Sequence, residues 1–147
     1  MQKSLQFVYI DTNVFLNSVL YDPKENIEAQ KALIYLQQVV KGEIKAVTST
    51  LTWDEFVWII KREIDRETSN QKGQEFLRFP NLIFEKVTLN VVKKAQDLLL
   101  KYSIRPRDGI HLATALLNKI ENFLTFDSDF DDISEIQIIK LQNLHIE

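Results

Sequence analysis

Four acidic residues of this chain stand where a strand is expected to end or a helix to begin. They are Asp11, Glu55, Asp108 and Asp127. If folding brings them together, the four carboxyl groups cannot all stay ionised without a cation between them. Oxygen ligands of this kind select Mg²⁺ or Mn²⁺, and the usual chemistry of such sites acts on phosphate esters. The four acids therefore predict a metal site suited to phosphodiester hydrolysis.

Asp11 and Asp127 each follow a short apolar run. Phe7–Ile10 precedes Asp11 and Asn122–Phe126 precedes Asp127, and both runs have the length and composition of a buried strand. Ligands of open parallel sheets bind beyond the carboxyl ends of the strands, near the point where strand order reverses. We therefore expect both carboxylates to point into the same crevice.

Glu55 and Asp108 are expected near the first turns of helices. A helix from about Thr52 to Glu67 would place Glu55 at its third position, so that Thr52 and Glu55 form a capping box. A second helix opens at Asp108 and runs from Gly109 to about Asn118. Taken singly, each acid is more commonly a partner of the helix dipole. Together with the two strand-end acids they favour a shared site, because these helix starts lie at the same edge of the sheet.

The rest of the chain alternates between helical and strand periodicity. In chain order we expect a helix from about Asn26 to Lys41 that ends at Gly42, a strand Ile44–Thr48, a strand Leu82–Val87, a helix capped by Thr88 or Asn90, and an edge strand Ile136–Leu141. Residues 68 to 80 are polar and receive no element. This order predicts one domain over residues 1–147 with a three-layer α/β fold, in which helices flank a central, mostly parallel sheet of four to five strands.

The composition is that of a soluble globular protein, with 45% hydrophobic and 27% charged residues. The chain has no cysteine, which excludes disulfides and thiolate metal sites and favours a cytoplasmic location. No apolar stretch is long enough to span a membrane, so we expect no membrane partner. The net charge of −3 gives no general attraction for nucleic acid, so RNA contacts must come from local basic patches and bound cations.

The acids stand in four short stretches with characteristic neighbours. The stretches are Asp11-Thr12-Asn13, Thr52-Trp53-Asp54-Glu55, Asp108 with the following Gly109–Ala115, and Thr125–Phe130. Each is weak alone, but their order and spacing over nearly the whole chain resemble the PIN domain, and more narrowly the VapC-type toxin ribonucleases. The resemblance implies a PIN-like fold and an Mg²⁺- or Mn²⁺-dependent endoribonuclease acting on single-stranded RNA. It also implies a homodimer and, in many cases, a cognate antitoxin.

On that resemblance the four acids become the metal-binding and catalytic residues. Asn13 and Thr125 match positions that support such a site through hydrogen bonds. Asp129 is a second acid near the fourth position, so the sequence leaves open whether Asp127 or Asp129 faces the metal. It also leaves open whether one ion binds or two.

An RNA substrate requires positive charge for its phosphates. Lys101, Arg105 and Arg107 lead into Asp108, and Lys119 follows the helix that Asp108 opens. We expect these four cations at the rim of the cleft as contacts for the RNA backbone. For any one of them, a solvated surface charge is an equally good interpretation.

Three ring side chains close to these stretches have a structural and a functional interpretation. His111 follows Asp108 by one helical turn, and we expect it to be partly buried with a structural role. Trp53 and Trp58 could stack on bases, although we expect most aromatic residues to lie in the core or on a dimer surface.

Other classes that place acids at strand ends fit less well. A haloacid-dehalogenase-like phosphatase needs Asp-x-Asp after the first strand, where this chain has Asp11-Thr12-Asn13. A receiver domain would need adjacent acids there and a lysine after a late strand. A glycine-rich phosphate loop is excluded, because the chain has only three glycines, far apart. The remaining alternative is a non-catalytic PIN-like module that binds RNA or protein, and the complete set of acids favours the nuclease over it.

Overall fold

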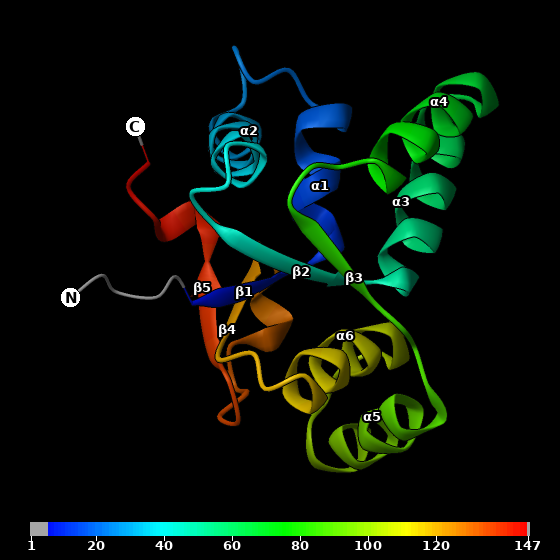
Figure 1. Ribbon diagram of the computed structural model, residues 1–147, viewed down its shortest axis with the longest axis vertical. Helices are drawn as coiled ribbons and strands as arrows, with labels where there is room; N and C mark the ends of the chain where they lie inside the picture. The colour runs from blue at the N-terminus through cyan, green and yellow to red at the C-terminus, as the bar shows by residue number, and fades with distance from the viewer. Residues whose placement is uncertain (1–5, 147) are drawn as a thin grey trace.

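The computed structural model describes residues 6–146 and has three layers, with a parallel sheet between two layers of helices (Figure 1). The sheet has five strands in the order β3-β2-β1-β4-β5, and every pair of neighbours is parallel. The strands are β1 Phe7–Ile10, β2 Lys45–Ser49, β3 Leu82–Glu85, β4 Asn122–Thr125 and β5 Gln137–Lys140. The predicted three-layer fold is confirmed, and the sheet is parallel throughout.

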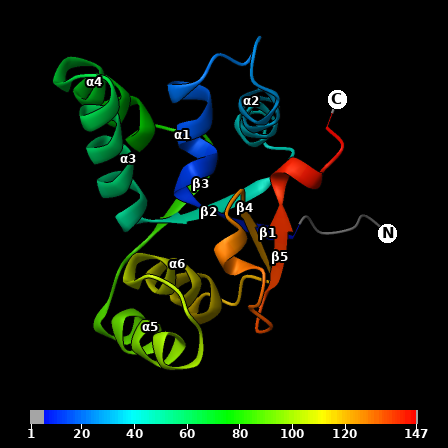
Figure 2. The ribbon, with the colours of Figure 1, turned by 180° about the vertical axis from the view of Figure 1, so that it is seen from behind.

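The helices divide between the two faces of the sheet. The front and back views show helices on both sides of the sheet (Figures 1 and 2), and the helices of each side pack on a separate core cluster. The helices are α1 Thr12–Leu20, α2 Ile27–Val40, α3 Thr50–Glu63 and α4 Arg66–Leu77 on the first face, and α5 Leu89–Lys101 and α6 Pro106–Leu117 on the second, with short 3-10 helices η1 Ser128–Phe130 and η2 Leu141–Asn143. Between residues 6 and 146, no helix combines the length and the apolar character needed to cross a membrane.

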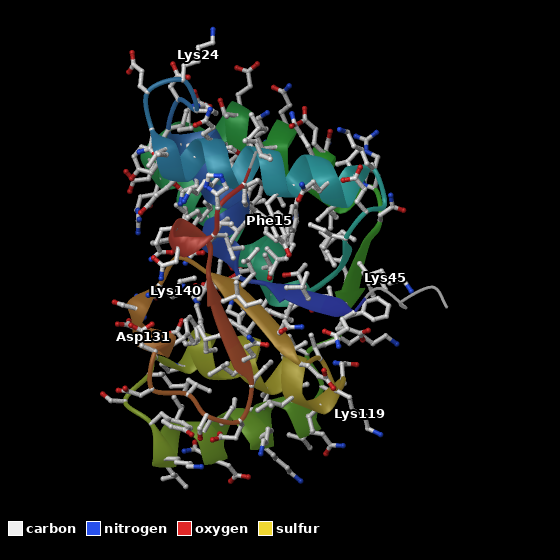
Figure 3. All side chains as sticks on the ribbon, turned by 90° about the vertical axis from the view of Figure 1, so that its left-hand side faces the viewer. Phe15, Lys24, Lys45, Lys119, Asp131 and Lys140 are labelled. Atoms are coloured by element: carbon white, nitrogen blue, oxygen red, sulfur yellow. The ribbon has the colours of Figure 1, made fainter. Side chains whose placement is uncertain are left out.

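Strand β1 lies in the middle of the sheet and is buried on both sides. Its residues alternate between the two cores, because successive side chains of a strand point to opposite faces. Val8 and Ile10 belong to the cluster beneath α1 to α4, where Phe15 of α1 fills the interior (Figure 3), whereas Tyr9 belongs to the cluster beneath α5 and α6. This burial explains why Val8, Tyr9 and Ile10 are apolar, whereas Phe7 at the start of the strand is 38% exposed.

The strand order reverses at β1. The chain moves from β1 to β2 and β3 on one side, and then crosses to β4 and β5 on the other. The backbone N–H of Asp11 donates to the carbonyl of Leu124 at 3.0 Å, which extends the pairing of β1 with β4 by one residue. The carboxyl ends of these two strands therefore meet at the switch point, where parallel sheets bind ligands.

The predicted capping box at Thr52 is wrong. Helix α3 begins at Thr50, and Ser49 is its cap residue. The Thr52 hydroxyl is instead fully buried and hydrogen-bonds the hydroxyl of Thr48 on β2 at 2.7 Å. Glu55 therefore lies in the second turn of α3, where its side chain does not cap the helix.

Residues 68 to 80, for which the sequence predicts no helix or strand, mostly belong to α4. Asp65 caps this helix by accepting a hydrogen bond from the Thr68 backbone at 2.7 Å. Only a narrow face is buried, through Ser69, Gly73 and Phe76. So narrow an apolar stripe gives too weak a periodic signal to be read from the sequence.

Gly42 ends α2 with the backbone geometry that the sequence predicts. Its φ is +79°, in the left-handed region. Its N–H donates to the carbonyl of Val39 at 2.9 Å, and the N–H of Glu43 donates to the carbonyl of Gln38 at 3.0 Å. These two bonds form a Schellman motif, which satisfies carbonyls that the helix end would leave free.

We predict that Gly42→Ala lowers the free energy of unfolding by about 1–2 kcal/mol, because a Cβ atom is strained in the left-handed region. Urea denaturation monitored by circular dichroism measures the change. Lys41→Ala is the matched control, because Lys41 has an ordinary helical φ of −75°. Equal stability of the two variants would contradict this account of the turn.

Candidate functional site

The structure brings the four predicted acids together. Asp11, Glu55, Asp108 and Asp127 all line one pocket of about 530 Å³, which opens at the carboxyl edge of the sheet. Asp11 follows β1, Asp127 follows β4, and the other two come from α3 and α6. Side chains more than a hundred residues apart in sequence therefore share one solvent-accessible site.

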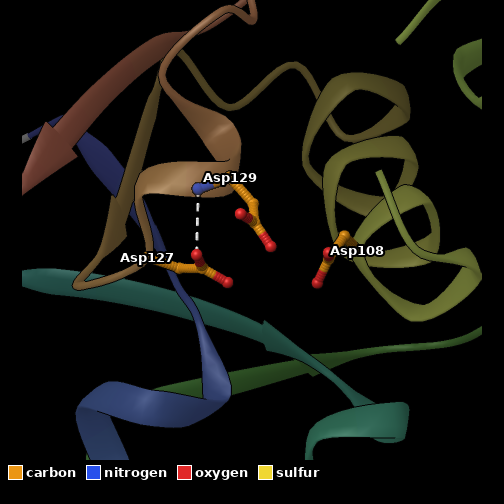
Figure 4. Close-up of side chains that lie close together, drawn as sticks. All are labelled: Asp108, Asp127 and Asp129. Carbon is orange, nitrogen blue, oxygen red and sulfur yellow. Dashed lines mark hydrogen bonds between the residues drawn. The ribbon is translucent and has the colours of Figure 1, made fainter. Parts of the chain in front are cut away.

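Three carboxylates in this region are close enough to hold one cation. Asp108, Asp127 and Asp129 each offer an oxygen, and the three oxygens lie within 4.8 Å of one another. Figure 4 shows Asp108 on α6 facing Asp127 and Asp129, which come from the end of β4 and from η1. The Asp129 backbone N–H donates to Asp127 at 2.9 Å. Asp127 and Asp129 thus both face Asp108. These three residues offer only oxygen donors, which suit a hard divalent ion.

The Asp11 carboxylate is fixed by hydrogen bonds to both oxygens. Its Oδ1 accepts from the backbone of Thr12 at 2.8 Å, so that Asp11 also caps α1. Its Oδ2 accepts from the hydroxyl of Thr125 at 2.8 Å and from Nδ2 of Asn13 at 3.2 Å. Such bonds orient a carboxylate before any ligand arrives.

Asn13 and Thr125 also connect the ends of β1 and β4. The Asn13 side-chain oxygen accepts from the backbone of Phe126 at 3.2 Å. The Thr125 hydroxyl accepts from the backbone of Asp127 at 2.9 Å. Asn13 and Thr125 bond each other at 3.3 Å as well. The two residues thus set the position of Asp127 relative to Asp11, which is the geometry that a supporting role would require.

His111 is fully buried rather than partly buried as predicted, and it contacts two of the acids. Its side chain is 1% exposed and lies beneath the acids. Nε2 is in close contact with Glu55 and lies 3.8 Å from Asp11, while Nδ1 hydrogen-bonds the hydroxyl of Tyr9 at 2.6 Å. The Thr12 hydroxyl donates to Glu55 at 2.9 Å. The helical spacing from Asp108 was the one signal in the sequence that could have indicated this contact.

Burial and neighbouring charges set the protonation of these groups. Burial raises the pKa of Asp11 and of Asp108, and the cations His111 and Arg105 offset this only in part. Burial also opposes ionisation of Glu55 and His111, but their mutual hydrogen bond and charges prevail. The pKa of Glu55 is therefore lowered and that of His111 is raised. Glu55, which lines the pocket, therefore forms an ion pair with the buried His111.

Two of the four predicted RNA-contacting cations lie at the pocket. Arg105 bonds Asp108 at 3.3 Å and Asp127 at 3.4 Å, although its side chain is 71% exposed. Arg107 lines the pocket too, and its charge contributes to the lowered pKa of Glu55. Both sit in or beside the first turn of α6, so the helix start supplies two cations together with Asp108.

The other two predicted cations lie elsewhere. Lys101 ends α5 and pairs with Glu135 at 3.0 Å, and it does not line the pocket. Lys119 follows the last turn of α6 (Figure 3), whereas the site is at the first turn of that helix. A helix of this length places Lys119 roughly 18 Å from the acids. The expectation that Lys101 and Lys119 lie at the rim of the cleft is wrong, because nearness to Asp108 in sequence does not give nearness in space.

Comparison with known proteins identifies relatives of the chain. The model of the PIN domain family matches residues 8–136. The chain is 25% identical over 146 residues to ribonuclease VapC2 of Methanocaldococcus jannaschii, in a match that covers 91% of this chain and 93% of the relative.

Solved structures share the fold at low sequence identity. The VapBC2 complex of Rickettsia felis, bound to a DNA fragment from its promoter, matches with a TM-score of 0.70 and 14% identity, covering 92% of this chain and 98% of that one. VapC20 of Mycobacterium tuberculosis, a toxin that cleaves the sarcin-ricin loop, matches with a TM-score of 0.67 and 15% identity, covering 88% and 98%.

We predict that the metal-free protein loses stability as the pH rises above 6.5, the ordinary pKa of histidine. A group whose pKa is raised by folding stabilises the protein below its unfolded pKa, and that stability is lost as the pH rises through the folded pKa. Urea denaturation in EDTA between pH 6 and 8 measures the effect, which can reach about 1.4 kcal/mol per pH unit. His111→Gln should flatten this slope, and an unchanged slope in the variant would contradict the assignment to His111.

We predict that Thr125→Val weakens Mn²⁺ binding roughly 10- to 100-fold, because it removes the hydroxyl that orients Asp11. Mn²⁺ bound to the folded protein raises the melting temperature, so a titration followed by thermal melts gives the affinity. The increase in melting temperature caused by Mn²⁺ should be smaller at pH 5.5 than at pH 7.5, because protons compete with the metal ion for Asp11 and Asp108.

Thr114→Val is the matched control for this experiment. Thr114 is also fully buried, but its hydroxyl donates to the backbone of Ile110 in α6 at 2.7 Å and does not touch the acids. A wild-type response to Mn²⁺ in Thr125→Val, or an equal loss in both variants, would count against the role of Thr125.

Proposed function

The chain belongs to the PIN domain family, and from that premise we propose that it is a metal-dependent endoribonuclease that hydrolyses phosphodiester bonds in single-stranded RNA. The observation that carries the proposal is the pocket in which four carboxylates from four separate elements meet. The similarity to a ribonuclease along almost the full length of both chains supports it.

Mg²⁺ or Mn²⁺ is the cation that we propose for this site. Asp108, Asp127 and Asp129 would hold it, and Asp11 faces the same pocket from the end of β1. When bound, a divalent ion supplies an acidic water for attack on phosphorus and neutralises charge that develops on the phosphate. The donor set is suited to this role, because it contains hard oxygens and neither sulfur nor imidazole.

The chain's own residues orient the reacting groups. Hydrogen bonds from Thr12 and Thr125 hold both oxygens of Asp11 in place. The lowered pKa of Glu55 keeps it ionised at neutral pH, so it adds an acceptor and a negative charge to the pocket. Arg105, exposed at the pocket, can exchange its carboxylate partners for a phosphate oxygen of the RNA.

We further propose that the protein is the toxin of a toxin–antitoxin pair in the cytoplasm. The solved complexes that share its fold support an antitoxin partner. A homodimer is supported by apolar side chains exposed on α5, where Leu89, Val92 and Leu100 are 68%, 45% and 79% exposed.

We predict that the purified protein cleaves single-stranded RNA with Mn²⁺ and not with EDTA, and that Asp11→Asn lowers the rate at least about 100-fold by loosening the metal site. Gel analysis of a labelled RNA measures the rate. Asp54→Asn is the matched control, because Asp54 neighbours Glu55 on α3 but does not line the pocket. Cleavage that persists in EDTA, or equally in Asp11→Asn, would exclude the metal mechanism. An absence of cleavage under all conditions would favour the non-catalytic alternative.

A further inference from the structure

Helix α3 carries a row of side chains that leads away from the acids. Glu55, Trp58, Ile59 and Arg62 all line the pocket that holds the carboxylates. They are spaced by three, four and seven residues, which places them on one face of a helix. The row therefore presents, in sequence, a carboxylate, an aromatic ring, an aliphatic side chain and a guanidinium.

Trp58 is unusually exposed for a residue that lines a pocket. It is 50% exposed, and the guanidinium carbon of Arg62 lies 4.6 Å from the centre of its ring. The side chain of Arg62 is itself more than half exposed. An aromatic surface left in water beside a charged site is typical of a binding surface rather than of the core.

Trp53 on the same helix provides a comparison. It is 40% exposed and lines a second pocket with residues of α4. Trp58 lines this second pocket too, but of the two tryptophans only Trp58 also lines the pocket that holds the acids. Its ring nitrogen would lie 3.5 Å from a Cβ built at Gly73, so it packs on the α3–α4 contact. Two exposed tryptophans on one helix thus differ in whether they face the site.

We propose that Trp58 stacks on an unpaired base next to the scissile phosphate, and that Arg62 contacts the phosphate beyond it. This inference rests on the proposed function and adds a residue that selects RNA with an unpaired base at this position. Trp58 lies about 4.5 Å further along the α3 axis than Glu55, and Arg62 lies about 10.5 Å further. A strand whose phosphate sits at the acids therefore meets an aromatic surface and then a cation along α3.

The chemistry of the row fits single-stranded RNA. Stacking on an aromatic side chain requires a base that is free of its own duplex, and it tolerates any base because every base has a π face. Arg62, Arg105 and Arg107 all line the pocket, so cations lie beside the acids although the whole chain has a net charge of −3. Arg62 also pairs with Glu63 at 2.8 Å, in an exposed ion pair that contributes little and that a phosphate can replace. Such local charge complements a phosphate backbone that crosses the site.

The test is binding of a fluorescently labelled, unstructured RNA oligonucleotide in EDTA, where a metal-dependent nuclease does not cut. We expect Trp58→Ala to weaken binding about tenfold, which corresponds to the loss of one stacked base. Trp58→Phe keeps a ring and should retain most of the affinity. Trp53→Ala, the matched control, should bind as the wild type does. In Mn²⁺, Trp58→Ala should raise KM about tenfold with little change in kcat.

The outcomes separate this inference from the proposed function. Wild-type affinity and KM in Trp58→Ala, in a protein that cleaves RNA, would overturn the stacking role alone. Binding that depends on Trp58 in a protein that never cleaves would support stacking and overturn the nuclease. If Trp58→Ala changes the sedimentation coefficient without changing RNA affinity, Trp58 belongs to a surface between two copies and the inference fails. Equal weakening by Trp53→Ala and Trp58→Ala would also overturn it.

Discussion

The partial burial of several carboxylates in one pocket is the constraint on which the rest of this site depends. The parallel sheet and its switch point bring acids from four elements to one edge, where burial makes the negative charges of Asp11 and Asp108 costlier than in water. Burial is the main cause of the raised pKa values of Asp11 and Asp108, and repulsion from neighbouring acids adds to it. Around this pocket, the chain is arranged so that the charges are held in place and offset.

The negative charges on the two sides of the pocket are balanced by different cations. On one side, the fully buried His111 lies against Glu55 and near Asp11, so a cation of the chain itself balances these acids. On the other side, the cation that contacts Asp108 and Asp127 is Arg105, which is mostly exposed and easily displaced. Asp129 adds a third negative charge there. This asymmetry indicates that an external divalent ion binds most favourably between Asp108, Asp127 and Asp129.

The sequence predicts those features that depend on local pattern. Asp11 and Asp127 could be placed because each follows an apolar strand, and Gly42 because a helix end favours a left-handed residue. The sequence does not indicate helix α4, because its buried face is narrow. It predicts the wrong start for α3, because the Thr52 hydroxyl bonds Thr48 on β2 and does not cap the helix. These are tertiary contacts, which override local propensity.

The site residues follow the same division. The hydrogen bonds of Asn13 and Thr125 agree with their expected supporting role, whereas His111 meets Glu55 across 56 positions of sequence. Only the packing of α3 against α6 creates that pair. The central claim is that the acids share a divalent ion, and anomalous diffraction from crystals soaked in Mn²⁺ tests it most directly. The account predicts an anomalous peak between Asp108, Asp127 and Asp129, within reach of Asp11. An empty pocket at saturating Mn²⁺, or peaks confined to other surfaces, would contradict it.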